Sequence, residues 1–193
     1  MEPFITHSGI AAPLLQDNID TDQIIPSREM KTVSKTGLAA GLFAGQRYLN
    51  GRTPNPDFVL NQPNFEGATI LLAGKNFGCG SSREHAAWAL KDYGIRAVIA
   101  ESFGEIFYNN CVRNGILCVV LSQGQIATLG KEITINLPAQ TANGMSFDIP
   151  DGDKNMLVNG LDPIMLTLQD KHEIDDFFKT DKIARPWVYK KGD

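Results

Sequence analysis

Residues 78–85 carry the most specific chemistry in this chain. They read Gly78-Cys79-Gly80-Ser81-Ser82-Arg83-Glu84-His85, and an apolar helical pattern follows them. The two glycines allow the backbone to turn sharply before a helix begins. A helix N-terminus attracts anions, and an arginine offers a planar fork that matches a carboxylate or a phosphate. The segment therefore predicts an anion-binding turn, with the Ser81 and Ser82 hydroxyls beside the bound group.

The same turn also has a purely structural interpretation. Serine is a preferred helix N-cap, so Ser81 or Ser82 could cap the helix while Arg83 pairs with Glu84 or with solvent. The local sequence favours neither interpretation. Three other motifs are excluded. No Gly-Lys-Ser/Thr follows the spacer of a phosphate-binding P-loop, neither serine has the flanking glycines of a hydrolase nucleophile elbow, and the glycines lack the spacing of a dinucleotide-binding fingerprint.

The elements that must position this turn follow from the apolar pattern. Three short apolar runs predict buried strands, at 68–73, 96–100 and 116–121. Two helical patterns separate these strands, at 83–93 and 103–114. Gly94 and Gly115 come next and can end the helices in the left-handed conformation. Strands that alternate with helices predict a parallel α/β sheet, whose C-terminal edge is the usual place for a ligand.

The rest of the chain predicts β-rich pieces around this core, within a single domain that spans 1–193. Short strands or turns are expected at 10–15 and 23–26, and antiparallel strands at 132–137 and 145–149. Short helices are expected at 37–49 and 123–130, a proline-rich loop at 51–65 and a mobile loop near 27–36. An amphipathic helix at 170–180 begins an extended C-terminal tail, with solvated charges at Asp175, Asp176, Lys179 and Asp181.

The composition restricts the possible function classes. The formal net charge is −4 and the basic residues are not clustered, which argues against a nucleic-acid partner. No apolar run is long enough for a membrane span, and residues 1–7 lack a secretory pattern, so we expect a cytoplasmic protein. The three cysteines lack metal-site spacing, so we expect no metal or cofactor on this chain. An iron–sulfur cluster, if one is needed, would have to come from another chain.

Three segments taken together resemble the aconitase superfamily. They are the turn at 78–85, the upstream run Asp17-Asn18-Ile19-Asp20-Thr21-Asp22-Gln23-Ile24-Ile25-Pro26, and the downstream run Ser102-Phe103-Gly104-Glu105-Ile106-Phe107-Tyr108-Asn109-Asn110. The chain resembles a free-standing swivelling domain, and within the superfamily it is most similar to the family of small subunits of bacterial isopropylmalate isomerases. This resemblance implies an α/β fold in β/β/α layers, with a mixed sheet and flanking helices.

The resemblance also implies a partner and a reaction. The partner is a large subunit that carries a four-iron, four-sulfur cluster, and the substrate is a small dicarboxylate. Loss and return of water move a hydroxyl between adjacent carbons of isopropylmalate, a step of leucine biosynthesis. At matching positions, Ser81 corresponds to the catalytic base, and Ser82 and Arg83 correspond to residues that bind a substrate carboxylate. Asp22 matches an aspartate that pairs with a catalytic histidine of the large subunit.

The exact substrate depends on the loop near 27–36, where related enzymes select among substrates. Arg28 and Lys31 in this loop are therefore expected substrate contacts. The segment Ser27-Arg28-Glu29-Met30-Lys31-Thr32 is less apolar than the loop expected of the commonest bacterial small subunits. Citraconate (methylmalate), dimethylmalate and homoaconitate are consequently alternative substrates.

Two other function classes use the same turn. A stand-alone serine or cysteine hydrolase would need an internal base beside Ser81 or Cys79, from one of the three histidines, His7, His85 and His172. Such a chain would cleave activated esters without a partner. A non-catalytic module would bind an organic acid and gain no activity from any large subunit.

Overall fold

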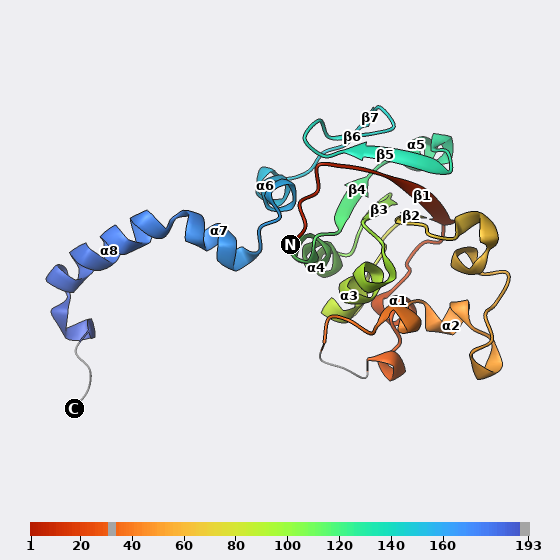
Figure 1. Cartoon of the computed structure of the whole chain (residues 1–193), viewed down its shortest axis with the longest axis horizontal. Coiled ribbons are helices and arrows are strands. Elements are labelled where there is room, and N and C mark those ends of the chain that lie inside the picture. The colour runs from red at the N-terminus through yellow and green to blue at the C-terminus, as the bar shows by residue number, and fades with distance from the viewer. Residues whose placement is uncertain (31–33, 190–193) are drawn as a thin grey trace.

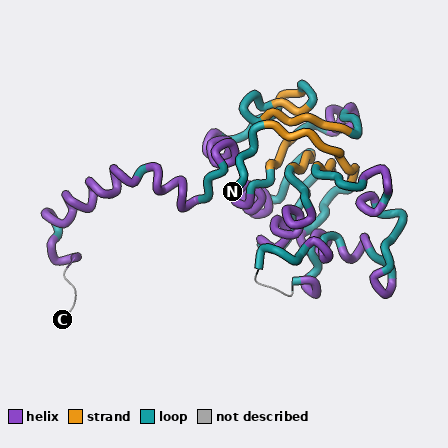
Figure 2. Tube along the Cα trace, viewed as in Figure 1, coloured by secondary structure: helices purple, strands orange, loops and turns teal. Residues whose placement is uncertain are grey.

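A seven-stranded mixed sheet organises the molecule (Figures 1 and 2). The computed structural model describes residues 1–30 and 34–189, so the predicted substrate contact Lys31 lies outside the described residues. The strands run in the order β4-β3-β2-β1-β5-β6-β7. Their bounds are Thr6–Leu14 (β1), Ile70–Ala73 (β2), Ala97–Ala100 (β3), Leu117–Val120 (β4), Glu132–Asn136 (β5), Thr141–Ala142 (β6) and Met145–Ser146 (β7).

Strand β1 joins the two parts of this sheet. It pairs in parallel with β2, which continues in parallel to β3 and β4, and it pairs antiparallel with β5, which continues to β6 and β7. The three predicted parallel strands and the predicted strand at 132–137 are confirmed. The predicted α/β class with a mixed sheet is confirmed as well.

Both faces of the parallel strands are covered, which explains their continuously apolar sequences. Alternate residues belong to two different cores. Leu71 and Val98 pack on one side with Leu90 of α3 (Glu84–Tyr93) and Phe107 of α4 (Glu105–Asn114). On the other side, the core includes Ile126 of α5 (Gln123–Thr128) and Leu157 of α6 (Asp151–Asn159). Because successive side chains of a strand point to opposite faces of the sheet, the apolar residues pack against helices on both faces.

Helices α3 and α4 end as predicted. Gly94 and Gly115 adopt left-handed conformations directly after them, with φ of 108° and 82°. Both glycines donate their amides to carbonyls of the preceding turn. These C-caps fix where the chain leaves each helix and returns to the sheet.

The segments between β1 and β2 differ from the prediction. Residues 23–26 are neither a strand nor a simple turn, because α1 (Thr21–Ile24) begins at an Asp20 N-cap with a complete capping box through Gln23. Two short pieces replace the helix predicted at 37–49, the 3₁₀ turn Ala39–Gly41 and α2 (Ala44–Arg47). Other 3₁₀ turns occupy Ser27–Glu29, Asn50–Arg52, Val59–Asn61 and Pro63–Phe65.

A helical arm follows α6 and extends away from the body (Figure 1). It consists of α7 (Pro163–Gln169), α8 (Lys171–Ala184) and the 3₁₀ turn Pro186–Tyr189. The helix predicted at 170–180 is confirmed, whereas α6 and α7 were not predicted. Asp181 is a correction to the predicted solvated charges, because it is 8% exposed and accepts hydrogen bonds from Arg185 Nε and Tyr189 Oη, each at 2.6 Å.

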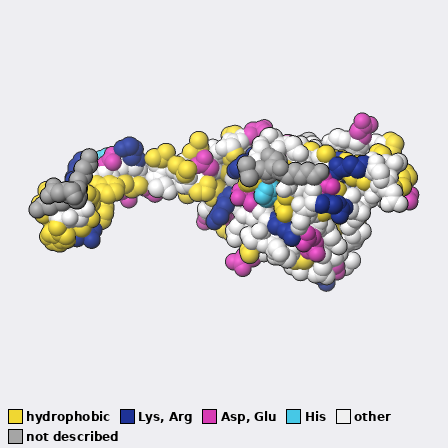
Figure 3. Space-filling view, turned by 90° about the horizontal axis from the view of Figure 1, so that it is seen from below, with side chains coloured by type: hydrophobic (Ala, Val, Ile, Leu, Met, Phe, Trp, Pro, Cys, Tyr) yellow, Lys and Arg dark blue, Asp and Glu magenta, His cyan; other side chains and the backbone are white. Residues whose placement is uncertain are grey.

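Hydrophobic side chains gather along this arm in the space-filling view (Figure 3). Eight large ones are exposed there, namely Ile164, Met165, Leu168, Phe177, Phe178, Ile183, Trp187 and Val188. Within the part of the chain that the structure describes, no helix has the length and apolar character that a bilayer span requires.

Candidate active site

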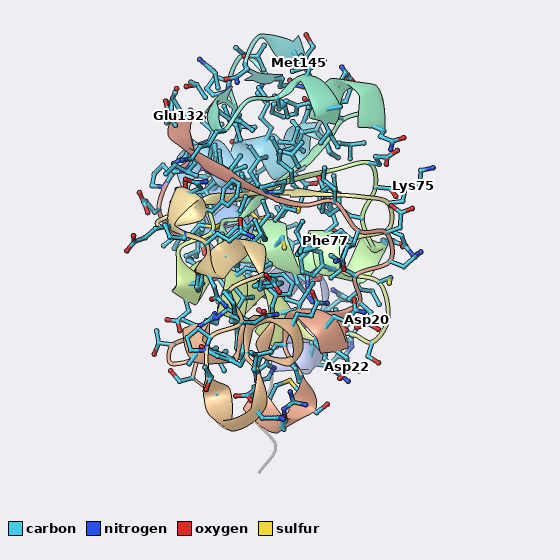
Figure 4. All side chains as sticks on the ribbon, turned by 90° about the vertical axis from the view of Figure 1, so that its right-hand side faces the viewer. Asp20, Asp22, Lys75, Phe77, Glu132 and Met145 are labelled. Atoms are coloured by element: carbon cyan, nitrogen blue, oxygen red, sulfur yellow. The ribbon has the colours of Figure 1, made fainter. Side chains whose placement is uncertain are left out.

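The three motif segments identified in the sequence meet at one place in the fold. The turn after β2 lies between the other two segments and is bonded to both. On one side, Gly78 donates its amide to the carbonyl of Ile19 at 2.7 Å. On the other side, Phe77 donates to the carbonyl of Ser102 at 3.0 Å and accepts from the amide of Gly104 at 2.9 Å. Asp20, Asp22 and Phe77 accordingly lie along the same side of the molecule in Figure 4.

Two glycines make this close meeting possible. Gly78 has a φ of 76°, and a Cβ placed on it would lie 2.1 Å from the ring of Phe107. A Cβ on Gly104 would lie 2.7 Å from the carbonyl oxygen of Gly78. A side chain at either position would therefore force the turn away from the start of α4. The two segments at 78–85 and 102–110 can therefore pack closely only because both contain a glycine at the point of contact.

Ser81 and Ser82 do not cap the helix, so that structural expectation is wrong. Helix α3 begins at Glu84, and its N-cap is Arg83, with φ of −130°, ψ of 98° and no side-chain cap bond. The extended conformation of Arg83 separates the serines from the first amides of the helix. Both serines are exposed. Within the described residues, the Ser81 hydroxyl makes no hydrogen bond, so it is open to a ligand.

Arg83 pairs with Asp22 of α1, and not with Glu84 as the structural interpretation expected. Its Nη1 donates to Asp22 Oδ1, and the Arg83 side chain is only 17% exposed against 56% for Asp22. This hydrogen bond with the guanidinium holds the pKa of the Asp22 carboxyl below its usual range. Glu84 accepts instead from Trp88 Nε1 at 3.2 Å and from Asn114 Nδ2 at 3.0 Å.

One residue of the site was not singled out from the sequence. The hydroxyl of Thr21 donates to the Ser81 carbonyl at 2.9 Å, and the amide of Thr21 donates to the Cys79 carbonyl at the same distance. Thr21 lies between two aspartates in the segment 17–26. Its position within that motif could have marked Thr21 as a site residue. The motif does not show, however, which side of α1 contacts the turn.

Arg28 lies apart from these contacts. Its side chain is 67% exposed, with Nε 3.7 Å from Glu29 Oε1. It lines an open groove of about 800 Å³ together with Tyr48 and Arg52. Over residues 1–30 and 34–189, no ion pair or hydrogen bond joins Arg28 to Asp22 or to the turn at 78–85. Its role in substrate binding stays a prediction.

Two of the three histidines, His7 and His172, make their contacts away from the turn at 78–85. His7 is bonded through Nε2 to Thr69 Oγ1 at 2.8 Å, and His172 lies on α8 in the arm. The ring of His85 contacts that of Trp88 in a tilted arrangement, with ring centroids 4.6 Å apart. Neither His7 nor His172 is therefore paired with Ser81 or Cys79 in the way that activates a nucleophile.

The donors of this chain do not fit an iron–sulfur cluster. Cys111 and Cys118 are buried in the core, whereas Cys79 lies in the turn and is half-buried, and all three are free thiols. Burial raises the pKa of the Cys111 thiol, which disfavours the thiolate that a metal needs. Among the described residues, no cluster of three or more His, Cys, Asp or Glu side chains could hold a metal ion.

Comparisons with known proteins identify the family. Residues 1–124 match the model of the aconitase C-terminal domain. The chain is 54% identical to the 3-isopropylmalate dehydratase small subunit of Cupriavidus necator, with all of both chains covered. It is 50% identical to that of Sinorhizobium fredii, with 97% of this chain and 100% of that protein covered.

A solved structure agrees with the sequence comparison. The crystal structure of 3-isopropylmalate dehydratase from Methanocaldococcus jannaschii superposes with a TM-score of 0.68 at 29% identity, and the match covers 89% of this chain and 99% of that one. The sheet, the turn and the two helices that carry the motif segments therefore belong to a known architecture. The chain is a member of the 3-isopropylmalate dehydratase small subunit family, within the aconitase superfamily.

Proposed function

We propose that this chain is the small subunit of a heteromeric hydro-lyase that interconverts 2-isopropylmalate and 3-isopropylmalate in leucine biosynthesis. The observation that carries the proposal is the meeting of Asp22, Ser81 and Arg83 in a chain that matches such small subunits over its full length. The family alone gives the class of reaction. The ion pair joins the side chains of Asp22 and Arg83, and the backbone of Ser81 is bonded to Thr21, the neighbour of Asp22, which supports a shared role for the three residues.

Ser81 is the proposed catalytic base. The proton to be removed lies on a carbon next to a carboxylate, and the resulting negative charge spreads toward that carboxylate. A serine hydroxyl is a weak base unless its deprotonated form is stabilised. The Arg83 guanidinium would supply positive charge for this purpose. Arg83, together with Ser82, would also hold the substrate carboxylate and orient the carbon toward Ser81.

The partner is a large subunit, and we propose that it carries the four-iron, four-sulfur cluster, since this chain lacks a suitable donor set in its described residues. Asp22 is the proposed contact for a histidine of that subunit. Its 56% exposure leaves the carboxylate accessible from outside the chain. A substrate carboxylate that binds Arg83 would compete with Asp22 for the guanidinium and so free Asp22 for this contact.

The proposed function is tested by reconstitution. The purified chain is mixed with a large subunit of the same family that is loaded with its cluster. The mixture is expected to form an alkene from 3-isopropylmalate, and the absorbance of the alkene measures the reaction. Neither subunit alone should react. A panel of citraconate, dimethylmalate and homoaconitate identifies the preferred substrate. Ester cleavage by the isolated chain, or inactivity of the mixture on every substrate of the panel, would contradict the proposal.

The exposed arm supports the proposal of a protein partner and yields a second prediction. Phe177 and Trp187 are 58% and 66% exposed, and aromatic residues of this kind often dominate binding energy at interfaces. Replacing both with serine is expected to weaken binding to the large subunit at least about 10-fold, as measured by sedimentation. The melting temperature should change little, because neither side chain is buried.

Lys171→Gln serves as the matched control for this double variant. Lys171 lies on the same helix as Phe177, is 65% exposed and pairs with Asp175, so this variant changes the charge of the arm's surface and leaves both aromatic residues in place. Its affinity should equal that of the unmodified chain. If the double variant binds as tightly as this control, the arm does not contact the large subunit.

A further inference from the structure

The side chain of Thr21 reaches the turn from inside the fold. It is the first residue of α1 and is only 2% exposed. Its hydroxyl donates to the Ser81 carbonyl at 2.9 Å, across 60 residues of sequence. Its amide donates to the carbonyl of Cys79, also at 2.9 Å. Two hydrogen bonds from a single residue therefore fix two carbonyls of the segment that ends at Ser81.

The helix that presents Thr21 is itself firmly held. The Asp20 side chain accepts from the amide of Gln23 at 2.7 Å and completes a capping box. Ile19 and Ile24, on either side of this cap, are 1% and 0% exposed. Because a buried apolar pair and a cap anchor α1, Thr21 offers a fixed reference point to the turn.

The turn needs such a reference point because its own backbone is permissive. Gly80, directly before Ser81, has a φ of 92°, and neither Ser81 nor Ser82 is buried. Glycine allows many orientations of the following peptide. Beyond the two serines, the Arg83–Asp22 ion pair holds the chain again. The Ser81 carbonyl bond is thus the contact that defines the backbone between Gly80 and Arg83.

A merely structural role for Thr21 is the alternative. A threonine methyl group can fill space in a core, and the residue could serve packing alone. Its hydroxyl, however, is buried, and a buried hydroxyl without a partner costs free energy. Valine has nearly the same shape as threonine and lacks the hydroxyl, so the two roles make different predictions for Thr21→Val.

We infer that Thr21 is a positioning residue, whose hydroxyl orients Ser81 for catalysis through the Ser81 carbonyl. This inference rests on the proposed function, in which Ser81 removes a proton from the substrate. Thr21 does not touch the substrate in this role. It fixes the backbone from which the Ser81 side chain projects, and displacements of about 1 Å in a catalytic group can lower rates by about 10²-fold.

The test compares Thr21→Val with Thr21→Ser in the two-subunit enzyme. Thr21→Val is expected to lower kcat by about 10- to 100-fold, with KM changed by less than about 3-fold. Thr21→Ser retains the hydroxyl and should stay within about 3-fold of the unmodified enzyme in kcat. Thr134→Val repeats the substitution at an exposed threonine of β5, whose hydroxyl bonds to the Ser8 hydroxyl far from the turn, and should leave kcat unchanged.

A second readout does not depend on activity. Hydrogen exchange of the Thr21 and Gly78 amides, which bond the α1 segment to the turn, should accelerate in the free small subunit of Thr21→Val and of Thr21→Ala, but not in Thr21→Ser or Thr134→Val. Thr21→Ala keeps the test available if valine disturbs folding. Equal kcat losses in Thr21→Ser and Thr21→Val would overturn the inference, and so would unchanged exchange in both hydroxyl-free variants. Inactivity of the unmodified enzyme would overturn the proposed function alone.

Discussion

Ser81→Ala is expected to lower kcat of the two-subunit enzyme by about 10²–10⁴-fold, the range typical for loss of a general base. The substitution removes the hydroxyl that would take the proton and leaves the backbone contacts intact. Thr21 bonds to the Ser81 carbonyl, which alanine retains. Since Ser81 is exposed and is not a helix cap, the loss should not be accompanied by lower stability. Kinetic assays measure the catalytic rate, the melting temperature reports stability, and sedimentation reports assembly of the complex.

Ser82→Ala is the informative comparison for Ser81→Ala. Ser82 is also exposed and lies in the same turn, so both variants remove one hydroxyl from the same surface. If Ser82 only binds the carboxylate, its loss should raise KM by about 10- to 100-fold and change kcat less, since one hydrogen bond to a charged group is worth about 1.5–3 kcal/mol. Near-normal kcat in Ser81→Ala would remove Ser81 from the role of base.

The elements that position the site were predictable because their signals are local. The continuously apolar strands at 70–73, 97–100 and 117–120 need cover on both faces, and the helices between them provide it. Gly94 and Gly115 end the two helices by a local conformational preference. The family resemblance added proposed roles for the serines and for Arg83, because the local chemistry did not decide between capping and catalysis.

The secondary-structure predictions failed where tertiary contacts or exposure override the local sequence preference. Ser82 has the right type for an N-cap, yet the turn is pulled toward α1 by the Gly78 and Thr21 hydrogen bonds and the helix starts later. Residues 23–26 are apolar enough for a strand, but Asp20 and Gln23 nucleate a helical turn. Helix α7 is exposed on the arm and has no buried face. Its sequence therefore lacks the regular spacing of buried apolar residues that predicts a helix.

The contacts within the site could not be predicted from the sequence. Asp22 and Arg83 are 61 residues apart, and their pairing depends on how α1 lies against the turn. The resemblance assigned Asp22 to a partner histidine and Arg83 to a substrate carboxylate, and therefore gave no reason to join them. In the free subunit the two side chains form an ion pair, which is a property of the fold rather than of either motif.

Arg83→Lys tests the function of that guanidinium and is expected to raise KM for the substrate by about 10- to 100-fold. Lysine keeps the positive charge but cannot form two parallel hydrogen bonds to a carboxylate. Loss of one charge-assisted bond, at about 1.5–3 kcal/mol, gives this range. Because the charge persists, kcat should fall less than KM rises. Steady-state kinetics over a wide range of substrate concentration measure both constants.

Arg96→Lys provides the matched control. Arg96 has almost the same side-chain exposure as Arg83, 19% against 17%, and likewise pairs with one exposed carboxylate, that of Glu2. The same substitution there changes an ion pair outside the candidate site, so kcat and KM should both stay within about 2-fold of the unmodified enzyme, as for most surface ion pairs. A lower kcat in Arg83→Lys with unchanged KM would mean that Arg83 stabilises only the transition state. The ion pair with Asp22 would then persist in the substrate complex, and substrate binding would not free Asp22 for the large subunit.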